Sequence, residues 1–209
     1  MDKGLFIGQI DDTIKESSCQ GKVAMVGWSS MDVAILGINA LKIRSRNASF
    51  VVDPVKTISK VGADAILLLN NNTDTDTSRV LDQRIIICGL GEYEVGTVKI
   101  SGITVSPPDR QAGNGVVYSL LLDSIQVVLG KVSDISRLYD NTPSCQIAIL
   151  KVDDDLKSIA AKLEPKIIVL YGDKKIEGAK TLGKQGIQPV QKFTITRDKL
   201  PDEMQVVVL

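Results

Sequence analysis

The 209-residue chain contains no histidine. Histidine is the commonest protein ligand of catalytic zinc and the usual general base near neutral pH. The chain therefore cannot build a Ser-His-Asp triad, a Cys-His dyad or a histidine-ligated zinc site from its own residues. This one absence removes the commonest classes of hydrolytic centre before any motif is considered.

The charge balance, the low aromatic content and the short apolar runs argue against nucleic-acid and membrane partners. The 25 basic residues are matched by 25 acidic ones, so no excess of positive charge is available to neutralise nucleic-acid phosphates. Aromatic residues make up only 4%, too few for a base-stacking platform. The longest apolar runs, such as residues 65–69, fall far short of the roughly 20 residues that a membrane helix needs. We therefore expect no nucleic-acid partner and no membrane association.

Cysteine is also sparse. Cys19, Cys88 and Cys145 lie far apart, in no CxxC spacing, which argues against a disulfide framework and against a thiolate metal site. The simplest interpretation is three buried apolar thiols in a reducing compartment. The N-terminus also lacks the pattern of a signal peptide. These features together predict a cytoplasmic protein.

The composition and the pattern of apolar residues predict a layered globular domain. Hydrophobic residues make up 44% and charged residues 24%, an ordinary globular composition. Alternating and continuous apolar runs predict closely spaced strands from Met31 onward, with a tight turn at Gly102. Helices are expected at residues 154–163 and 174–185. Strands covered by helices predict an α/β (α+β) domain over residues 31–209. Residues 1–30 differ in pattern and are predicted to form an N-terminal extension outside this core.

The polar loop at residues 70–77 follows the buried strand predicted at residues 65–69. Polar loops at the ends of buried strands are common ligand sites in α/β folds. Three interpretations fit the loop by itself: a solvated turn rich in Asn, Asp and Thr, an oxygen-donor site for calcium or magnesium, or the remnant of a lost catalytic loop.

Several motifs make the sequence similar to the metallo-β-lactamase superfamily, especially to the ascorbate-6-phosphate lactonase-like zinc-dependent hydrolases. In that family a strand ending in Ala-Asp-Ala-hydrophobic runs into His-x-His-x-Asp-His. Here residues 63–69, Ala-Asp-Ala-Ile-Leu-Leu-Leu, run directly into Asn-Asn-Asn-Thr-Asp-Thr. The Gly-Glu-Tyr-Glu turn at residues 91–94 and the strand end Asp53-Pro54 also match. The resemblance implies a four-layer αββα sandwich.

The resemblance also locates the positions at which the family holds its metal ions. The family's histidines fall at Ile38, Asn70, Asn72 and Thr75, and at or near Gly172. Its two aspartates fall at Asp74, which is retained, and near Lys131. The scaffold motifs are thus kept while the metal ligands are lost, so no zinc and no other cofactor is expected.

Two of these positions have further interpretations. Lys131 would place a positive charge where the family binds two dications, or it would pair with Asp74 and fill the old site. Asp74 is as easily interpreted as the cap of a turn or helix start. The exposed glutamates Glu92 and Glu94 are interpreted as ordinary hairpin residues rather than as acid–base groups.

The loss of the ligands leads to two competing functional hypotheses. The first is a catalytically inactive member of the fold that acts as a binding or structural module, through a homo-oligomer or a protein partner. The second is a hydrolase with residual or altered activity at a remodelled cleft.

Overall fold

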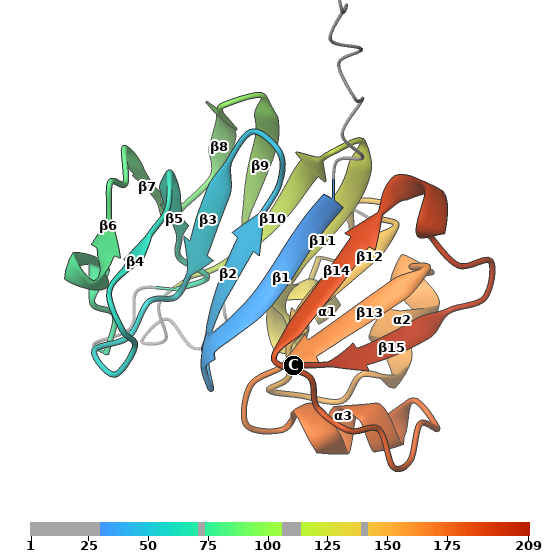
Figure 1. The fold of residues 1–209 in the computed structure, drawn as a ribbon. Coiled ribbons are helices and arrows are strands. Elements are labelled where there is room, and N and C mark those ends of the chain that lie inside the picture. The colour runs from blue at the N-terminus through green and yellow to red at the C-terminus, as the bar shows by residue number, and fades with distance from the viewer. Residues whose placement is uncertain (1–29, 71–73, 106–113, 139–141) are drawn as a thin grey trace, which may run out of the picture.

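Two mixed β-sheets pack face to face in the computed structural model, which describes residues 30–70, 74–105, 114–138 and 142–209 (Figure 1). The six-stranded sheet contains, in spatial order, β14 (Lys192–Thr196), β1 (Ser30–Gly37), β2 (Ala40–Arg44), β3 (Ser49–Val52), β5 (Ala65–Leu67) and β7 (Ile85–Ile87). The seven-stranded sheet contains, in spatial order, β15 (Gln205–Val208), β13 (Ile167–Tyr171), β12 (Ile147–Lys151), β11 (Ile125–Lys131), β10 (Gly115–Leu122), β9 (Val98–Val105) and β8 (Gly91–Val95).

The main core lies between the two sheets, because the strands of each sheet direct alternate apolar side chains inward. Its largest fully buried members include Phe50, Leu67 and Tyr118. The Tyr118 hydroxyl joins the sheets directly: it lies 2.8 Å from the Leu68 carbonyl oxygen and 2.9 Å from the Ile87 carbonyl oxygen, and it shares its one proton between them. Burial raises the pKa of Tyr118 well above its ordinary value.

A second hydrophobic core lies between the outer face of the seven-stranded sheet and three short helices. These are α1 (Val132–Ser136), α2 (Lys157–Leu163) and α3 (Lys175–Thr181). On the outer face of the six-stranded sheet, the described residues contribute a small ribbon of β4 (Val61–Gly62) and β6 (Val80–Leu81) over a third apolar cluster. The predicted sandwich is therefore confirmed, and the three α-helices of the described part all belong to the layer over the seven-stranded sheet.

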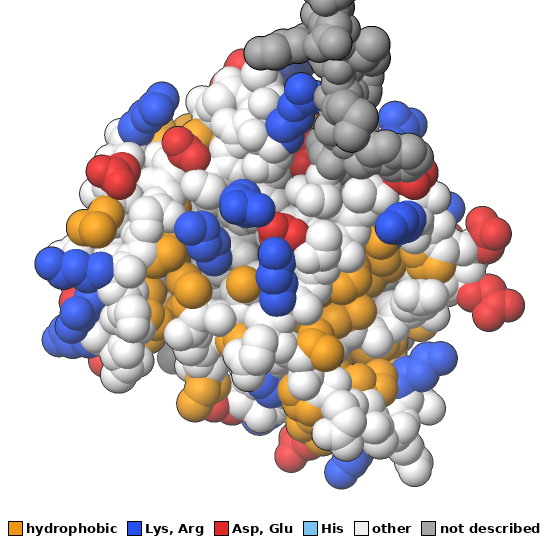
Figure 2. Space-filling view, in the orientation of Figure 1, with side chains coloured by type: hydrophobic (Ala, Val, Ile, Leu, Met, Phe, Trp, Pro, Cys, Tyr) orange, Lys and Arg blue, Asp and Glu red, His pale blue; other side chains and the backbone are white. Residues whose placement is uncertain are grey.

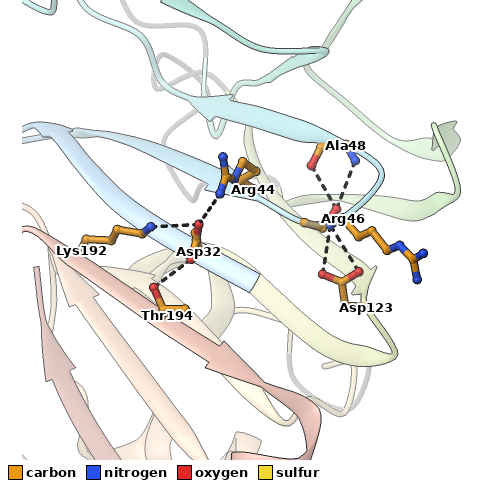
Figure 3. A network of polar contacts seen from close by, with 8 residues as sticks. Asp32, Arg44, Arg46, Ala48, Asp123, Lys192 and Thr194 are labelled. Atoms are coloured by element: carbon orange, nitrogen blue, oxygen red, sulfur yellow. Dashed lines mark hydrogen bonds and ion pairs between the residues drawn. The ribbon is translucent and has the colours of Figure 1, made fainter. Parts of the chain in front are cut away.

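The outer face of the six-stranded sheet is polar over β14, β1 and β2 and carries several basic side chains (Figure 2). Asp32 on β1 is only 6% exposed there. Its carboxylate lies 3.0 Å from Lys192 Nζ and 3.1 Å from Arg44 Nη2, and it accepts a 2.8 Å hydrogen bond from Thr194 (Figure 3). Burial alone would raise the pKa of Asp32, but these hydrogen bonds and charges together hold it below its ordinary value.

Two hairpin turns, one from each sheet, meet at one end of the sandwich. Asp123 and Ser124 both have positive φ, 48° and 65°, and form the two-residue turn expected between β10 and β11. The Asp123 carboxylate accepts a hydrogen bond from the Arg46 amide in the turn between β2 and β3 (Figure 3). This contact helps to hold the two sheets in register at the end opposite to the carboxyl ends of their parallel strands.

The direction of the parallel strands indicates which edge of the sandwich is the candidate ligand site. β11, β12 and β13 run parallel to one another in one sheet, and β3, β5 and β7 run parallel in the other. The carboxyl ends of neighbouring parallel strands lie along one edge of their sheet, which is where open sheets place ligand sites. We call this the carboxyl edge of the sandwich.

Three sequence-based predictions are wrong in detail. Gly102 is not a turn but lies within the continuous strand β9, where a Cβ atom would overlap the Gly89 carbonyl oxygen; the tight turn is at Gly96, with φ 63°. The helices predicted at residues 154–163 and 174–185 are shorter and span Lys157–Leu163 and Lys175–Thr181. Cys88 is exposed rather than buried, whereas Cys145 is partly buried, and burial raises its pKa to about 12.

Two further expectations concern the N-terminal extension and membrane association. β1 begins at Ser30, whereas residues 1–29, and with them Cys19 and the predicted extension, lie outside the described residues. Among the helices of the described ranges, none is long and apolar enough to cross a membrane.

Candidate functional site

Three polar side chains end the parallel strands of the seven-stranded sheet on its inward face. Lys131, Lys151 and Tyr171 are neighbours in register across β11, β12 and β13. Each stands two positions beyond an inward core residue, namely Leu129, Ile149 and Val169. Strand alternation therefore directs all three side chains between the sheets, at the carboxyl edge.

Asp53 faces these residues from the six-stranded sheet. It follows β3 directly, is 4% exposed and has a positive φ of 42°. Its Oδ1 accepts a 2.9 Å hydrogen bond from the Leu69 amide, which follows the neighbouring strand β5. Its Oδ2 lies 3.6 Å from Lys151 Nζ, an ion pair that joins the two sheets. Burial raises the pKa of Asp53; Lys151, the Leu69 amide and Lys131 oppose that rise without cancelling it.

The Tyr171 hydroxyl is the most deeply placed polar group at this edge. The side chain is fully buried, and among the described residues its oxygen has no hydrogen-bond partner. Burial, with smaller contributions from Asp53 and Asp153, raises the pKa of Tyr171 far above its ordinary value. The phenol is therefore a permanent hydrogen-bond donor near neutral pH.

Lys131 is partly exposed, and its charge acts on two buried carboxylates. Its charge opposes the raised pKa values of both Asp53 and Asp134. Asp134 is 5% exposed and forms its 3.5 Å ion pair with Arg137. In the described part of the chain, no carboxylate oxygen lies within the 4.0 Å ion-pair distance of Lys131 Nζ. The predicted pairing of Lys131 with Asp74 is therefore not what the structure shows.

The remaining predicted positions divide between this edge and the surface. Gly172, with φ 96°, is buried against Lys151: a Cβ there would stand 3.5 Å from Lys151 Cγ. Asn70 directly follows Leu69, whose amide binds Asp53. Ile38 lies in the turn between β1 and β2 and is 63% exposed. Asn72 lies outside the described residues.

The loop that carries Asp74 returns to the segment after Asp53. Thr75 forms a β-bridge with Val55, and the Asp76 amide donates a 2.8 Å hydrogen bond to the Pro54 carbonyl. Asp74 itself is exposed. The helix cap predicted for Asp74 is instead Asp76, whose Oδ1 accepts hydrogen bonds from the Ser78 amide and hydroxyl at the start of the 3₁₀-helix η1 (Thr77–Arg79).

The two aspartates should therefore respond differently to substitution. We expect Asp76→Ala to lower the melting temperature by roughly 3 °C, because the helix loses its cap, whereas Asp74→Ala leaves it unchanged. Asp76→Ser retains a capping oxygen and should restore most of the loss. Thermal unfolding followed by circular dichroism measures all three variants; a larger loss for Asp74→Ala than for Asp76→Ala would contradict the assignment.

The donor set at the carboxyl edge does not suit the zinc pair that the family resemblance implies. Zinc prefers imidazole, thiolate and carboxylate ligands, whereas this edge presents two ammonium groups, a phenol and one carboxylate already bound to an amide and a lysine. Nowhere in the described ranges do three or more Cys, Asp or Glu side chains gather as they would around a metal ion. We therefore derive no chemistry from a metal ion at this site.

Sequence reasoning identified Lys131 and Gly172 but missed Asp53, Lys151 and Tyr171. A usable signal was present for the last two. Each extends the inward period-two pattern of a buried strand with a polar residue at the strand's last position. Asp53 was interpreted only as part of a strand terminator, because the sequence does not reveal which lysine it faces.

Comparison with known proteins supports the fold. No family model and no curated protein sequence matches the chain. A protein from Thermotoga maritima, assigned as a zinc-dependent hydrolase of the metallo-β-lactamase superfamily, superposes with a TM-score of 0.64 at 18% identity, over 85% of this chain and 97% of that one. A protein from Parabacteroides distasonis assigned as a metal-dependent hydrolase gives a TM-score of 0.58 at 19% identity, over 86% and 93% of the two chains.

A metallo hydrolase from the archaeon Ignicoccus hospitalis superposes with a TM-score of 0.54 at 11% identity, over 79% of this chain and 98% of that chain. The similarity covers nearly the full length of each of these proteins, so it describes a whole domain rather than a shared fragment. The chain has the metallo-β-lactamase fold.

Proposed function

We propose that this protein is a catalytically inactive member of the metallo-β-lactamase fold that serves as a binding or structural module. The observation that carries the proposal is the ion pair between Lys151 and Asp53, with Lys131 beside it, at the edge where the fold's hydrolases are expected to hold metal ions. On this proposal Ile38, Asn70, Asn72, Asp74, Thr75, Lys131 and Gly172 are remnants of the family's site.

Electrostatics supports the proposal. Two unit charges of the same sign about 4 Å apart repel by about 4 kcal/mol at an effective dielectric constant of about 20, and a dication doubles that figure. Two ammonium groups at one site thus oppose metal binding. The Lys151 ammonium instead supplies the positive charge that the buried Asp53 carboxylate requires.

Metal content tests the proposal directly. We expect purified protein to retain less than about 0.1 zinc ion per chain after dialysis, because the ligands for tight binding are missing. Elemental analysis measures the ratio, with a zinc-loaded hydrolase of the same fold as the control. One or more ions per chain retained after dialysis would overturn the proposal.

A metal-free hydrolase is the second candidate, and the contact between Lys151 and Asp53 is the observation that favours it. An amine and a carboxylate in contact can act as an acid–base pair when burial adjusts their protonation. Assays with phosphodiester, lactone and thioester substrates separate the candidates. Turnover by the wild type that disappears in Lys151→Met, with folding intact, would establish the second candidate and exclude the first.

Exposed apolar residues in and near β7, the edge strand of the six-stranded sheet in the described part of the chain, support a role in association. Ile85 and Ile86 of β7 are 37% and 41% exposed; Leu81 of β6 and Leu90, which precedes β8, are 45% and 74% exposed. Exposed apolar strand edges commonly pair with another chain. We propose a homo-oligomer or a protein partner on this basis. Light scattering that finds a strict monomer, together with a pull-down that recovers no partner, would count against it.

A further inference from the structure

We propose that the carboxyl edge binds a small oxyanion, a phosphate or carboxylate group, between Lys131, Lys151 and Tyr171. The inference deepens the proposed binding function and depends on it, because it requires that the lysines, and not metal ions, supply the positive charge at this edge. It inverts the charge preference of the site: an edge that suits cations in hydrolases of this fold would here attract an anion.

Counting donors and acceptors at this edge supports an anion. Lys131 and Lys151 each carry three N–H donors, and the Tyr171 hydroxyl carries one. The facing acceptor is Asp53, whose Oδ1 is already occupied by the Leu69 amide. Its Oδ2 lies 3.6 Å from Lys151 Nζ and accepts no hydrogen bond among the described residues. The ammonium and phenol donors are therefore not hydrogen-bonded to Asp53, and a group rich in acceptor oxygens placed between them would satisfy them.

The unsatisfied Tyr171 hydroxyl is an independent indication. A buried hydroxyl without a partner is costly and rare in native proteins. Tyr171 is fully buried, and among the described residues its oxygen has no hydrogen-bond partner. Because the phenol stays protonated, it can satisfy itself by donating to an acceptor placed between it and the lysines.

The carboxylates around this edge each contact a group other than Lys131. Asp53 is taken by Lys151, Asp134 by Arg137, and Asp153 accepts hydrogen bonds of 2.9 and 2.6 Å from the Ser133 amide and hydroxyl. Lys131 is the cation at this edge that no described carboxylate approaches within ion-pair distance. Charge-assisted contacts from an ammonium group to an oxyanion are among the stronger hydrogen bonds.

Exposure indicates how an anion would reach the site. Lys131 is partly exposed and the Lys151 side chain is 13% exposed, whereas Tyr171 is inaccessible. The two lysines are thus the part of this edge that solvent reaches. An anion entering from the lysine side would meet Lys131 first.

Titration of the full-length protein with inorganic phosphate, followed by ¹H–¹⁵N NMR, tests the inference, and acetate in a parallel titration distinguishes phosphate from carboxylate preference. We expect saturable shifts at the ends of β11, β12 and β13 with at least one of the two anions. Lys131→Met should weaken binding roughly tenfold or more, and Tyr171→Phe should weaken it while leaving the fold intact. Lys99→Met, which removes an exposed lysine of β9, is the matched control and should bind as the wild type does.

Two outcomes would overturn the inference: no saturable binding of either anion, or binding that Lys131→Met and Lys99→Met weaken equally. Neither outcome bears on the metal content, the turnover or the association state, which are the tests of the proposed function. The two proposals can therefore fail separately.

Discussion

Replacement of Lys151 by alanine is expected to lower the free energy of unfolding by roughly 3 kcal/mol, because it leaves Asp53 buried without its counter-charge. Asp53 is 4% exposed, so it depends on the ammonium group rather than on solvent for its counter-charge. Urea denaturation of the wild type and the variant measures the difference. A loss below about 1 kcal/mol, the range of a surface ion pair, would show that the pair carries little of the stability.

The double variant Lys151→Ala with Asp53→Asn supplies the control. Removal of both charges should recover part of the loss, since neutral replacements of a buried pair cost much less than one unpaired charge. The Lys151→Ala variant should also be less impaired at low pH. Burial already raises the pKa of Asp53 in the wild type, so its protonated form is favoured on folding, and that contribution disappears as pH rises through the folded-state pKa.

Alkaline solution is expected to destabilise the protein by about 2 kcal/mol between pH 10 and 11, in addition to any effect of lysine titration. Tyr118 and Tyr171 are both fully buried with raised pKa values. Groups with raised pKa values hold their protons in the folded state and lose them in the unfolded state. Their contribution to stability is complete below pH 10 and is lost above it.

Replacement of each tyrosine by phenylalanine shows how much of the alkaline destabilisation each hydroxyl causes. Tyr171→Phe should halve the alkaline loss and cost little at pH 7, because the hydroxyl has no partner among the described residues. Tyr118→Phe should also reduce it but should cost stability at pH 7, since two carbonyl oxygens lose their donor. If the free energy of unfolding falls equally steeply above pH 10 in the wild type and in both variants, the buried phenols are not responsible for the destabilisation.

Local patterns were sufficient to predict most of the fold. The strand at residues 167–171 is fully buried and has the bounds that its apolar run predicts. The turn at Asp123-Ser124 is where two apolar runs required it. Gly102 misled the prediction because a glycine can mark either a turn or the close approach of another backbone, and only the tertiary fold brings Gly89 against it.

The site was less predictable for a different reason. Lys131 could be identified from its place in a motif, but its neighbours depend on strand order. Lys151 and Tyr171 become its neighbours only because β12 and β13 follow β11 in the sheet. Asp53 joins them only when the other sheet packs across the core. No local pattern distinguishes that arrangement from the pairing with Asp74 that the sequence suggested.

The ion pair between Asp53 and Lys151 joins residues from opposite halves of the chain. We expect such a contact to form late in folding, because distant segments must first be brought together. Interactions absent from the transition state act on the rate of unfolding rather than on the rate of folding. The ion pair would then lengthen the lifetime of the native state.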